Sequence, residues 1–227
     1  AKGFPAVNVS EGSNGETQYS LSLQILALMT GLTVLPSLVL GMTSFTRVII
    51  VLSILRQAMG TQQTPPNQVL IAIALFLTFF IMGPTLNLIN DNAISPYLSE
   101  TKSAEVALED GSKIIKNFLV TNTRETDLLM FSDMNGDKSY TSNESVPFNE
   151  ALPAFITSEL KTAFQIGFLL FLPFLVIDMV IASILMALGM MMLSPMLVSL
   201  PFKLLLFVLV DGWAMTIGSL AATYSIS

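Results

Sequence analysis

Two residue types are missing from the 227-residue chain: it contains no cysteine and no histidine. Without cysteine the protein forms neither disulfides nor thiolate sites, and without histidine it lacks the commonest general base and metal ligand at neutral pH. Zinc centres and nucleophile–histidine triads are therefore excluded. The chain also lacks a P-loop and a GxGxxG motif, so nucleotide hydrolysis has no support in the sequence.

Charge is scarce and unevenly distributed. Only 11% of the residues are charged while 52% are hydrophobic, and the net charge is −6. Of the 26 charged residues, 17 lie within residues 100–161, which leaves long tracts almost free of charge. This composition is typical of a membrane protein. The acidic balance and the lack of a basic patch with interleaved aromatics argue against a nucleic-acid partner.

Four hydrophobic segments are each close to the ~20 residues that a spanning helix needs. They cover residues 21–42, 69–89, 163–188 and 196–220. Residues 43–59 form a further apolar helical stretch that fits a four-segment topology only awkwardly. We therefore expect four regions: a flexible N-terminus (1–20), a first hydrophobic region (21–90), an acidic loop subdomain (91–160) and a second hydrophobic hairpin (161–227).

Proline interrupts three of the hydrophobic segments, at Pro36, Pro84 and Pro173. Each proline removes a helix hydrogen bond and crowds the preceding turn, so the sequence predicts kinked or broken helices. At membrane depth the freed backbone groups need partners. The fold class expected is all-α, with membrane-associated helical hairpins that pack in an assembly.

Orientation follows from the positive-inside tendency. Arg47 and Arg56 precede a short connection, whereas the long connection is acidic. The arginine side is therefore expected to be cytoplasmic, with both termini and the acidic loop on the other side. The chain starts without a basic n-region or initiator methionine, which we interpret as a signal segment that was removed or not included.

The acidic loop is predicted to contain two helices. Apolar residues recur at helical spacing over residues 104–119, which indicates an amphipathic helix. A second helix is expected to begin at Asn122, whose side chain would cap the first turn while Glu125 reaches back.

The stretch "DMNGDKSYTSNE" has the twelve-residue length of an EF-hand loop. Its candidate calcium ligands are Asp133, Asn135, Asp137, Thr141 and Glu144. Lys138 occupies the position where an EF-hand needs glycine for its sharp turn. The alternative interpretation is a solvated acidic turn, and no other metal site is expected.

Asp178 and Lys203 lie inside apolar tracts, where a charge is costly and needs a partner. Their midpoint falls within "GMMMLSP", residues 189–195. A hairpin at this point would place both charges at similar depth, either within one subunit or between neighbouring copies. The pair is then a structural ion pair, or Asp178 is the carrier of a proton relay. Asp211, near a helix end, is interpreted as a membrane-surface anchor.

Three long runs carry a family resemblance. They are "TSFTRVIIVLSILRQAMGTQQTPPNQVLIAIALFLTFFIMGP" (43–84), "TSELKTAFQIGFLLFLPFLVIDMVIASILMALGMMMLSP" (157–195) and "LPFKLLLFVLVDGW" (200–213). They closely resemble the FliP family of flagellar export-gate proteins. The resemblance implies a non-enzymatic subunit, without cofactor, of the type III secretion apparatus that exports flagellar rod, hook and filament proteins.

The same resemblance implies a location and partners. The protein would sit in the bacterial inner (cell) membrane, in the flagellar basal body, with a large part on the periplasmic side. It would form a helical, pore-forming homo-oligomer, a pentamer, with FliQ and FliR, next to FlhB and FlhA, and would pass unfolded export substrates. In this family the hydrophobic hairpins form a cone held largely above the bilayer plane.

The resemblance also implies two sets of site residues. Met190, Met191 and Met192 match the family's pore gasket, and Asp178 and Lys203 match charged positions that pair between subunits. Flexible apolar methionines can pack into a plug and part around varied polypeptides, although from their chemistry alone they could equally fill a core between hairpins. A virulence injectisome subunit, a proton-coupled transporter subunit and a passive scaffold are the alternative functions.

Overall fold

The computed structural model describes residues 7–11, 17–21, 23–61, 63–136, 140, 145–190 and 192–224. It divides into two compact units, Ala1–Gly41 and Met42–Ser227. The first unit contains an antiparallel ribbon of strands β1 (Val7–Glu11) and β2 (Thr17–Leu21), followed by helix α1 (Leu23–Gly41). The sequence pattern does not predict this ribbon. Most large side chains of the uncharged α1 are exposed, so this helix needs lipid or protein around it.

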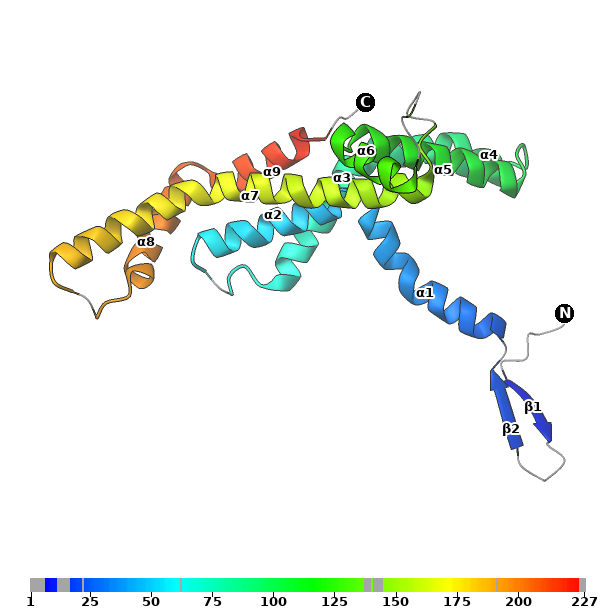
Figure 1. Cartoon of the computed structure of the whole chain (residues 1–227), viewed down its shortest axis with the longest axis horizontal. Coiled ribbons are helices and arrows are strands. Elements are labelled where there is room, and N and C mark those ends of the chain that lie inside the picture. Colours follow the sequence, from blue (N-terminus) through cyan, green and yellow to red (C-terminus); the bar gives the residue numbers. More distant parts are fainter. Residues whose placement is uncertain are drawn as a thin grey trace. The chain divides into compact units, whose positions relative to one another are not determined.

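The second unit is entirely helical in its described part (Figure 1). Its elements are α2 (Phe45–Ala58), α3 (Asn67–Ile89), the π-helix η1 (Asn90–Ile94), α4 (Ser95–Leu98), α5 (Ala104–Thr121), α6 (Glu125–Asn135), α7 (Phe148–Ala187), α8 (Pro195–Leu209) and α9 (Gly212–Ala222). Apart from the N-terminal ribbon, the prediction of an all-α protein with long apolar helices is confirmed.

Helix α7 is the longest element and organises this unit. Its 40 residues extend about 60 Å, twice the thickness of a hydrocarbon core of about 30 Å. Figure 1 shows α2 alongside it, α8 turning back at one end, and α5 and α6 beside the other end. The expected segment began at residue 163, but the helix begins at Phe148. It therefore runs without interruption from the acidic loop into the second hydrophobic region.

Two continuous helical stretches are long and apolar enough to cross a membrane: Asn67–Leu98 and Phe148–Ala187. Helices α8 and α9 reach this length only together and are bent by 62° at their junction. Of the predicted kink or break at each proline, the break is wrong, since Pro36, Pro84 and Pro173 all lie inside helices.

The junction of α8 and α9 has a local cause. Asp211 adopts a left-handed conformation with φ 50°, which stops the helix. A Cβ atom at Gly212 would lie 2.2 Å from the ring of Phe207, so only glycine permits the ring to pack there. The expected single segment 196–220 is therefore two helices.

The acidic loop contains α5 where the amphipathic helix was predicted. The predicted cap of the next helix was wrong: Asn122 ends α5, and its amide donates to the carbonyl of Phe118 at 2.9 Å. Helix α6 begins at Glu125, with Arg124 at its N-cap. Asn122 thus satisfies a C-terminal carbonyl of the preceding helix, a role that its position in the sequence does not distinguish from an N-cap.

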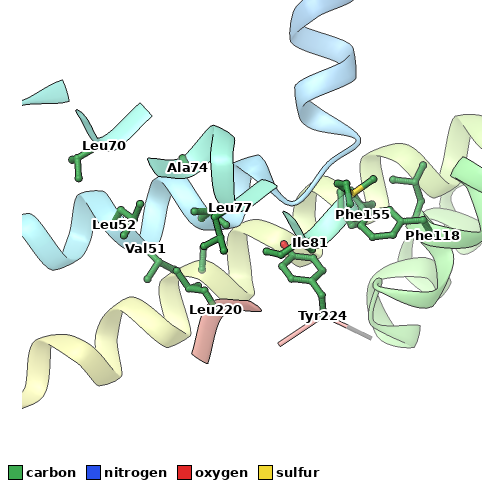
Figure 2. Packing of buried hydrophobic residues seen from close by; sticks show 14 residues of the cluster. Val51, Leu52, Leu70, Ala74, Leu77, Ile81, Phe118, Phe155, Leu220 and Tyr224 are labelled. Carbon is green, nitrogen blue, oxygen red and sulfur yellow. The ribbon is translucent and has the colours of Figure 1, made fainter. Parts of the chain in front are cut away.

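The main core lies where α2, α3 and α7 meet the end of α5 and the C-terminal residues (Figure 2). The ring of Phe118 packs against Phe155 at 5.9 Å and stacks on Tyr224 at 6.3 Å between ring centroids. Aromatic pairs at this separation stabilise a core beyond their buried area. Phe118 thereby anchors the amphipathic helix α5 on the core that it shares with the long apolar helices α3 and α7.

Helices α2 and α7 pack closely at Gly167. A Cβ atom there would lie 2.4 Å from Cδ1 of Ile54. We expect Gly167→Ala to lower the free energy of unfolding by about 1–3 kcal/mol, because Ile54 must leave its place in a packed interface. Denaturation of the detergent-solubilised chain measures this loss. The double variant Gly167→Ala/Ile54→Ala should be no less stable than Ile54→Ala alone, because the clash is then absent. A Gly167→Ala variant as stable as the parent would contradict the close packing.

Candidate functional site

The connection between α7 and α8 forms the tip of a helical hairpin. After α7 ends at Ala187, Gly189 takes a left-handed conformation with φ 73°, which glycine adopts without steric cost. The amide of Met190 donates to the carbonyl of Leu185 at 2.9 Å. Pro195 then opens α8 at its first turn, where its missing N–H costs no helix hydrogen bond.

Met190 and Met192, the two described methionines of this tip, are not covered by the rest of the chain. Met190 is 44% exposed and Met192 is fully exposed, while Met191 lies outside the described residues. Leu188 and Leu193 beside them are exposed as well. Met190 and Met192 therefore do not fill a core between hairpins of this chain, and the tip presents uncovered apolar surface without a charge.

Asp178 and Lys203 meet across the same hairpin. The ammonium Nζ of Lys203 lies 2.6 Å from Oδ2 of Asp178, and the hydroxyl of Ser199 donates to the other carboxylate oxygen at 2.5 Å. The residues alone left open whether the charges pair within one chain or between copies, and the family resemblance implied pairing between subunits. The structure brings them together within one chain, so neutralisation does not need a neighbouring copy.

The environments of the two charges differ. The side chain of Lys203 is 3% exposed and that of Asp178 is 31% exposed. Lys203 also donates to the carbonyl of Ala58 at 3.2 Å, the last residue of α2. The charge of Lys203 is therefore stabilised by Asp178 and the carbonyl of Ala58, whereas the carboxylate of Asp178 remains partly accessible from outside the chain.

A second, fully buried ion pair joins α2 to α7. The guanidinium of Arg47 binds both carboxylate oxygens of Glu159, with Nε 2.9 Å from Oε2. The side chains are 5% and 0% exposed. The bidentate geometry is the strong form of such pairs. The orientation argument counted Arg47 with Arg56 as a charge beside the short connection. Arg47 lies at the opposite end of α2 and is buried, so it does not support that argument.

The Arg47–Glu159 pair also holds the C-terminal end of the described chain. Arg47 donates to the side-chain and main-chain oxygens of Thr223, at 2.9 and 3.3 Å, and its guanidinium carbon lies 3.9 Å above the ring of Tyr224. The Tyr224 hydroxyl donates to Glu159. Burial and the nearby carboxylate raise the pKa of this hydroxyl above its usual range, so it remains a donor.

Comparison with known proteins identifies the family of the chain. Residues 28–220 match the model of the FliP family. The chain belongs to the FliP family. It is 73% identical over 222 residues to the flagellar biosynthetic protein FliP of Cereibacter sphaeroides, an alignment that covers 98% of this chain and 73% of that protein.

More distant relatives carry the same name. The flagellar biosynthetic protein FliP of Pectobacterium carotovorum is 54% identical over 221 residues, covering 97% of this chain and 86% of the relative. That of Bacillus subtilis is 47% identical over 218 residues, covering 96% and 98%. This FliP-family protein is a flagellar export component and not an enzyme.

The calcium candidate of this FliP-family protein lies partly outside the described residues, which exclude Asp137, Thr141 and Glu144. Asp133 and Asn135 are in the last turn of α6, and the amide of Asn135 donates to Glu150 at 2.5 Å. Among the described residues, no group of three or more acidic side chains is arranged to hold a metal ion. The described part thus uses Asn135 to bind a neighbouring carboxylate.

Proposed function

We propose that this FliP-family protein is a core subunit of the flagellar type III export gate, and that copies of it form the protein-conducting pore. The methionines at the tip of the α7–α8 hairpin then meet around the pore axis and seal it at rest. The observation that carries this proposal is the exposure of Met190 and Met192 on an uncharged tip.

The chain's surface supports assembly with other subunits. Large apolar side chains are uncovered along several helices, including the α3 aromatics Phe76, Phe79 and Phe80 and the α7 residues Phe164 and Phe168. Contiguous apolar surface of this kind requires lipid or a protein partner. We assign these surfaces to neighbouring copies in a pentamer, to FliQ and FliR, and to contacts with FlhB and FlhA.

The chemistry of the tip suits a seal for unfolded substrates. Methionine is unbranched and flexible, so a ring of such side chains excludes water and ions yet rearranges around polypeptides of varied sequence. The Asp178–Lys203 pair acts as a structural contact of the hairpin, since a carboxylate 2.6 Å from an ammonium is a poor proton carrier. The location proposed is the bacterial inner membrane, with the α5–α6 region on the periplasmic side.

Replacing Met190, Met191 and Met192 together by alanine is the test of the seal. We expect the ion conductance of membranes that contain the assembled complex to rise several-fold, because the shorter side chains leave a hydrated gap. The measurement is ion leakage from cells or liposomes at equal amounts of complex.

A matched control replaces three other exposed methionines, Met134, Met179 and Met215, by alanine. These lie on α6, α7 and α9, away from the tip, and should leave the conductance at the parental level. An unchanged conductance of the tip variant in a complex of normal mass would contradict the seal.

A further inference from the structure

The connection between α2 and α3, described at residues 59–61 and 63–66, touches the hairpin that carries the methionines. Gly60 takes a left-handed conformation with φ 77°. A Cβ atom at this position would lie 3.6 Å from Cδ1 of Leu200 and 3.9 Å from Nζ of Lys203, both on α8. The connection therefore packs directly on α8 without an intervening side chain.

Lys203 links this connection to the hairpin by polar contacts. The C-terminal carbonyls of a helix have no partner inside the helix, and Lys203 supplies one for Ala58, the last residue of α2. A cation at a helix C-terminus is also favoured by the helix dipole. The same ammonium binds Asp178 of α7, so one buried side chain joins α2, α7 and α8.

The connection itself is held firmly on its other side. A guanidinium nitrogen of Arg56 donates to the carbonyl of Pro65 at 3.2 Å and to the side-chain oxygen of Asn67 at 2.6 Å. These bonds tie the end of α2 to the start of α3. Residues 63, 64 and 66 are nevertheless exposed, so a partner can reach the outer side of a connection whose inner side contacts α8.

We infer that Lys203 and Gly60 are positioning residues through which the α2–α3 connection sets the position of the methionine tip. A partner that shifts this connection also moves the C-terminus of α2, and Lys203 passes the shift to α8. The inference rests on the proposed function only for the consequence, opening of the seal. The mechanical link between the α2–α3 connection and α8 does not depend on whether the methionines form a seal.

Gly60→Val tests the link without altering Asp178, Lys203 or the methionines. A β-branched side chain is strained at this φ and presses on Leu200. The chain has no cysteine, so Ile71→Cys on α3 and Met196→Cys on α8, both exposed, provide the only spin-label sites. The labelled chain is assembled with its partners in nanodiscs and diluted with the cysteine-free chain, so that distances within one chain dominate.

We expect Gly60→Val to shift and broaden the distance distribution between residues 71 and 196, and to raise the ion conductance of the assembled complex. The matched control is Gly136→Val, which has the same type of strained backbone, φ 83°, with no atom within 4 Å of an added Cβ. It should change neither quantity. An unchanged distance in Gly60→Val would overturn the inference even if the triple-alanine variant leaks.

Leu200→Ala provides a second route if Gly60→Val does not accumulate. It removes the side chain that touches Gly60 and leaves the backbone of the connection unstrained. A smaller shift of the same distance supports the link, and an unchanged distance overturns it. A shifted distance without increased conductance, together with a tight triple-alanine variant, would remove the seal but keep the mechanical link.

Discussion

Glu159→Ala is expected to lower the free energy of unfolding by about 3–5 kcal/mol, because it leaves the guanidinium of Arg47 buried without an anion. The pair lies at the junction of α2, α7 and the C-terminal residues, so its loss also removes the carboxylate to which the Tyr224 hydroxyl donates. Chemical denaturation of the detergent-solubilised chain, together with the amount of chain in the membrane, measures the effect.

Two comparisons show whether the buried charge is the cause. Glu109→Ala breaks the exposed pair Lys113–Glu109 and should leave stability unchanged, since exposed pairs contribute little. Arg47→Met/Glu159→Leu removes both charges and should recover most of the stability, because apolar replacements of a buried pair are often neutral or stabilising. A double variant no more stable than Glu159→Ala would contradict this account.

Asp178→Ala is expected to be more damaging than Lys203→Met, although both break the same ion pair. Removing the carboxylate leaves Lys203, which is almost fully buried, with only the carbonyl of Ala58, at a cost of up to about 3–5 kcal/mol. Removing the lysine leaves a partly exposed carboxylate that still accepts from Ser199. Denaturation of the two single variants measures the difference, and equal losses would contradict it.

The charge swap Asp178→Lys/Lys203→Asp should recover stability only in part. It restores opposite charges at the two positions, but the shorter side chain introduced by Lys203→Asp leaves the carbonyl of Ala58 without its donor, and a carboxylate near the C-terminus of α2 is disfavoured by the helix dipole. Because the pair lies within one chain, both the loss and the recovery are expected before assembly. A swap no better than either single variant would argue against direct pairing.

Much of the helical framework could be predicted from hydropathy. The uncharged tracts correspond to α1, α3, α7 and α8, and even the awkward apolar stretch at 43–59 is a separate helix, α2. The contact of Asp178 with Lys203 could also be anticipated, because two charges equidistant from a Gly…Pro turn must lie at similar depth in a hairpin. A helix or a turn can be predicted from the sequence where residues close to it in the chain determine its conformation.

The remaining features depend on contacts between distant segments. Arg47 and Glu159 are 112 residues apart, and nothing near Arg47 distinguishes a buried partner from a membrane-surface charge. The available signal was an arginine at the start of a largely apolar helix. The bend at Gly212 likewise depends on the packing of Phe207, whereas the prolines, which sequence rules favour as breaks, are accommodated inside helices.

The continuity of α7 joins the acidic region to the methionine tip through one unbroken helix. From Glu159, which Arg47 binds, to Ala187 the helix is about 42 Å long at 1.5 Å per residue. Because α2 packs on this stretch at Gly167 and is tied to it through Lys203, a tilt of α7 carries α2 and α8 with it, and a tilt of about 5° displaces the far end by about 4 Å. Under the proposed function, a tilt of this size would move the tip by about the width of the side chains that would seal the pore.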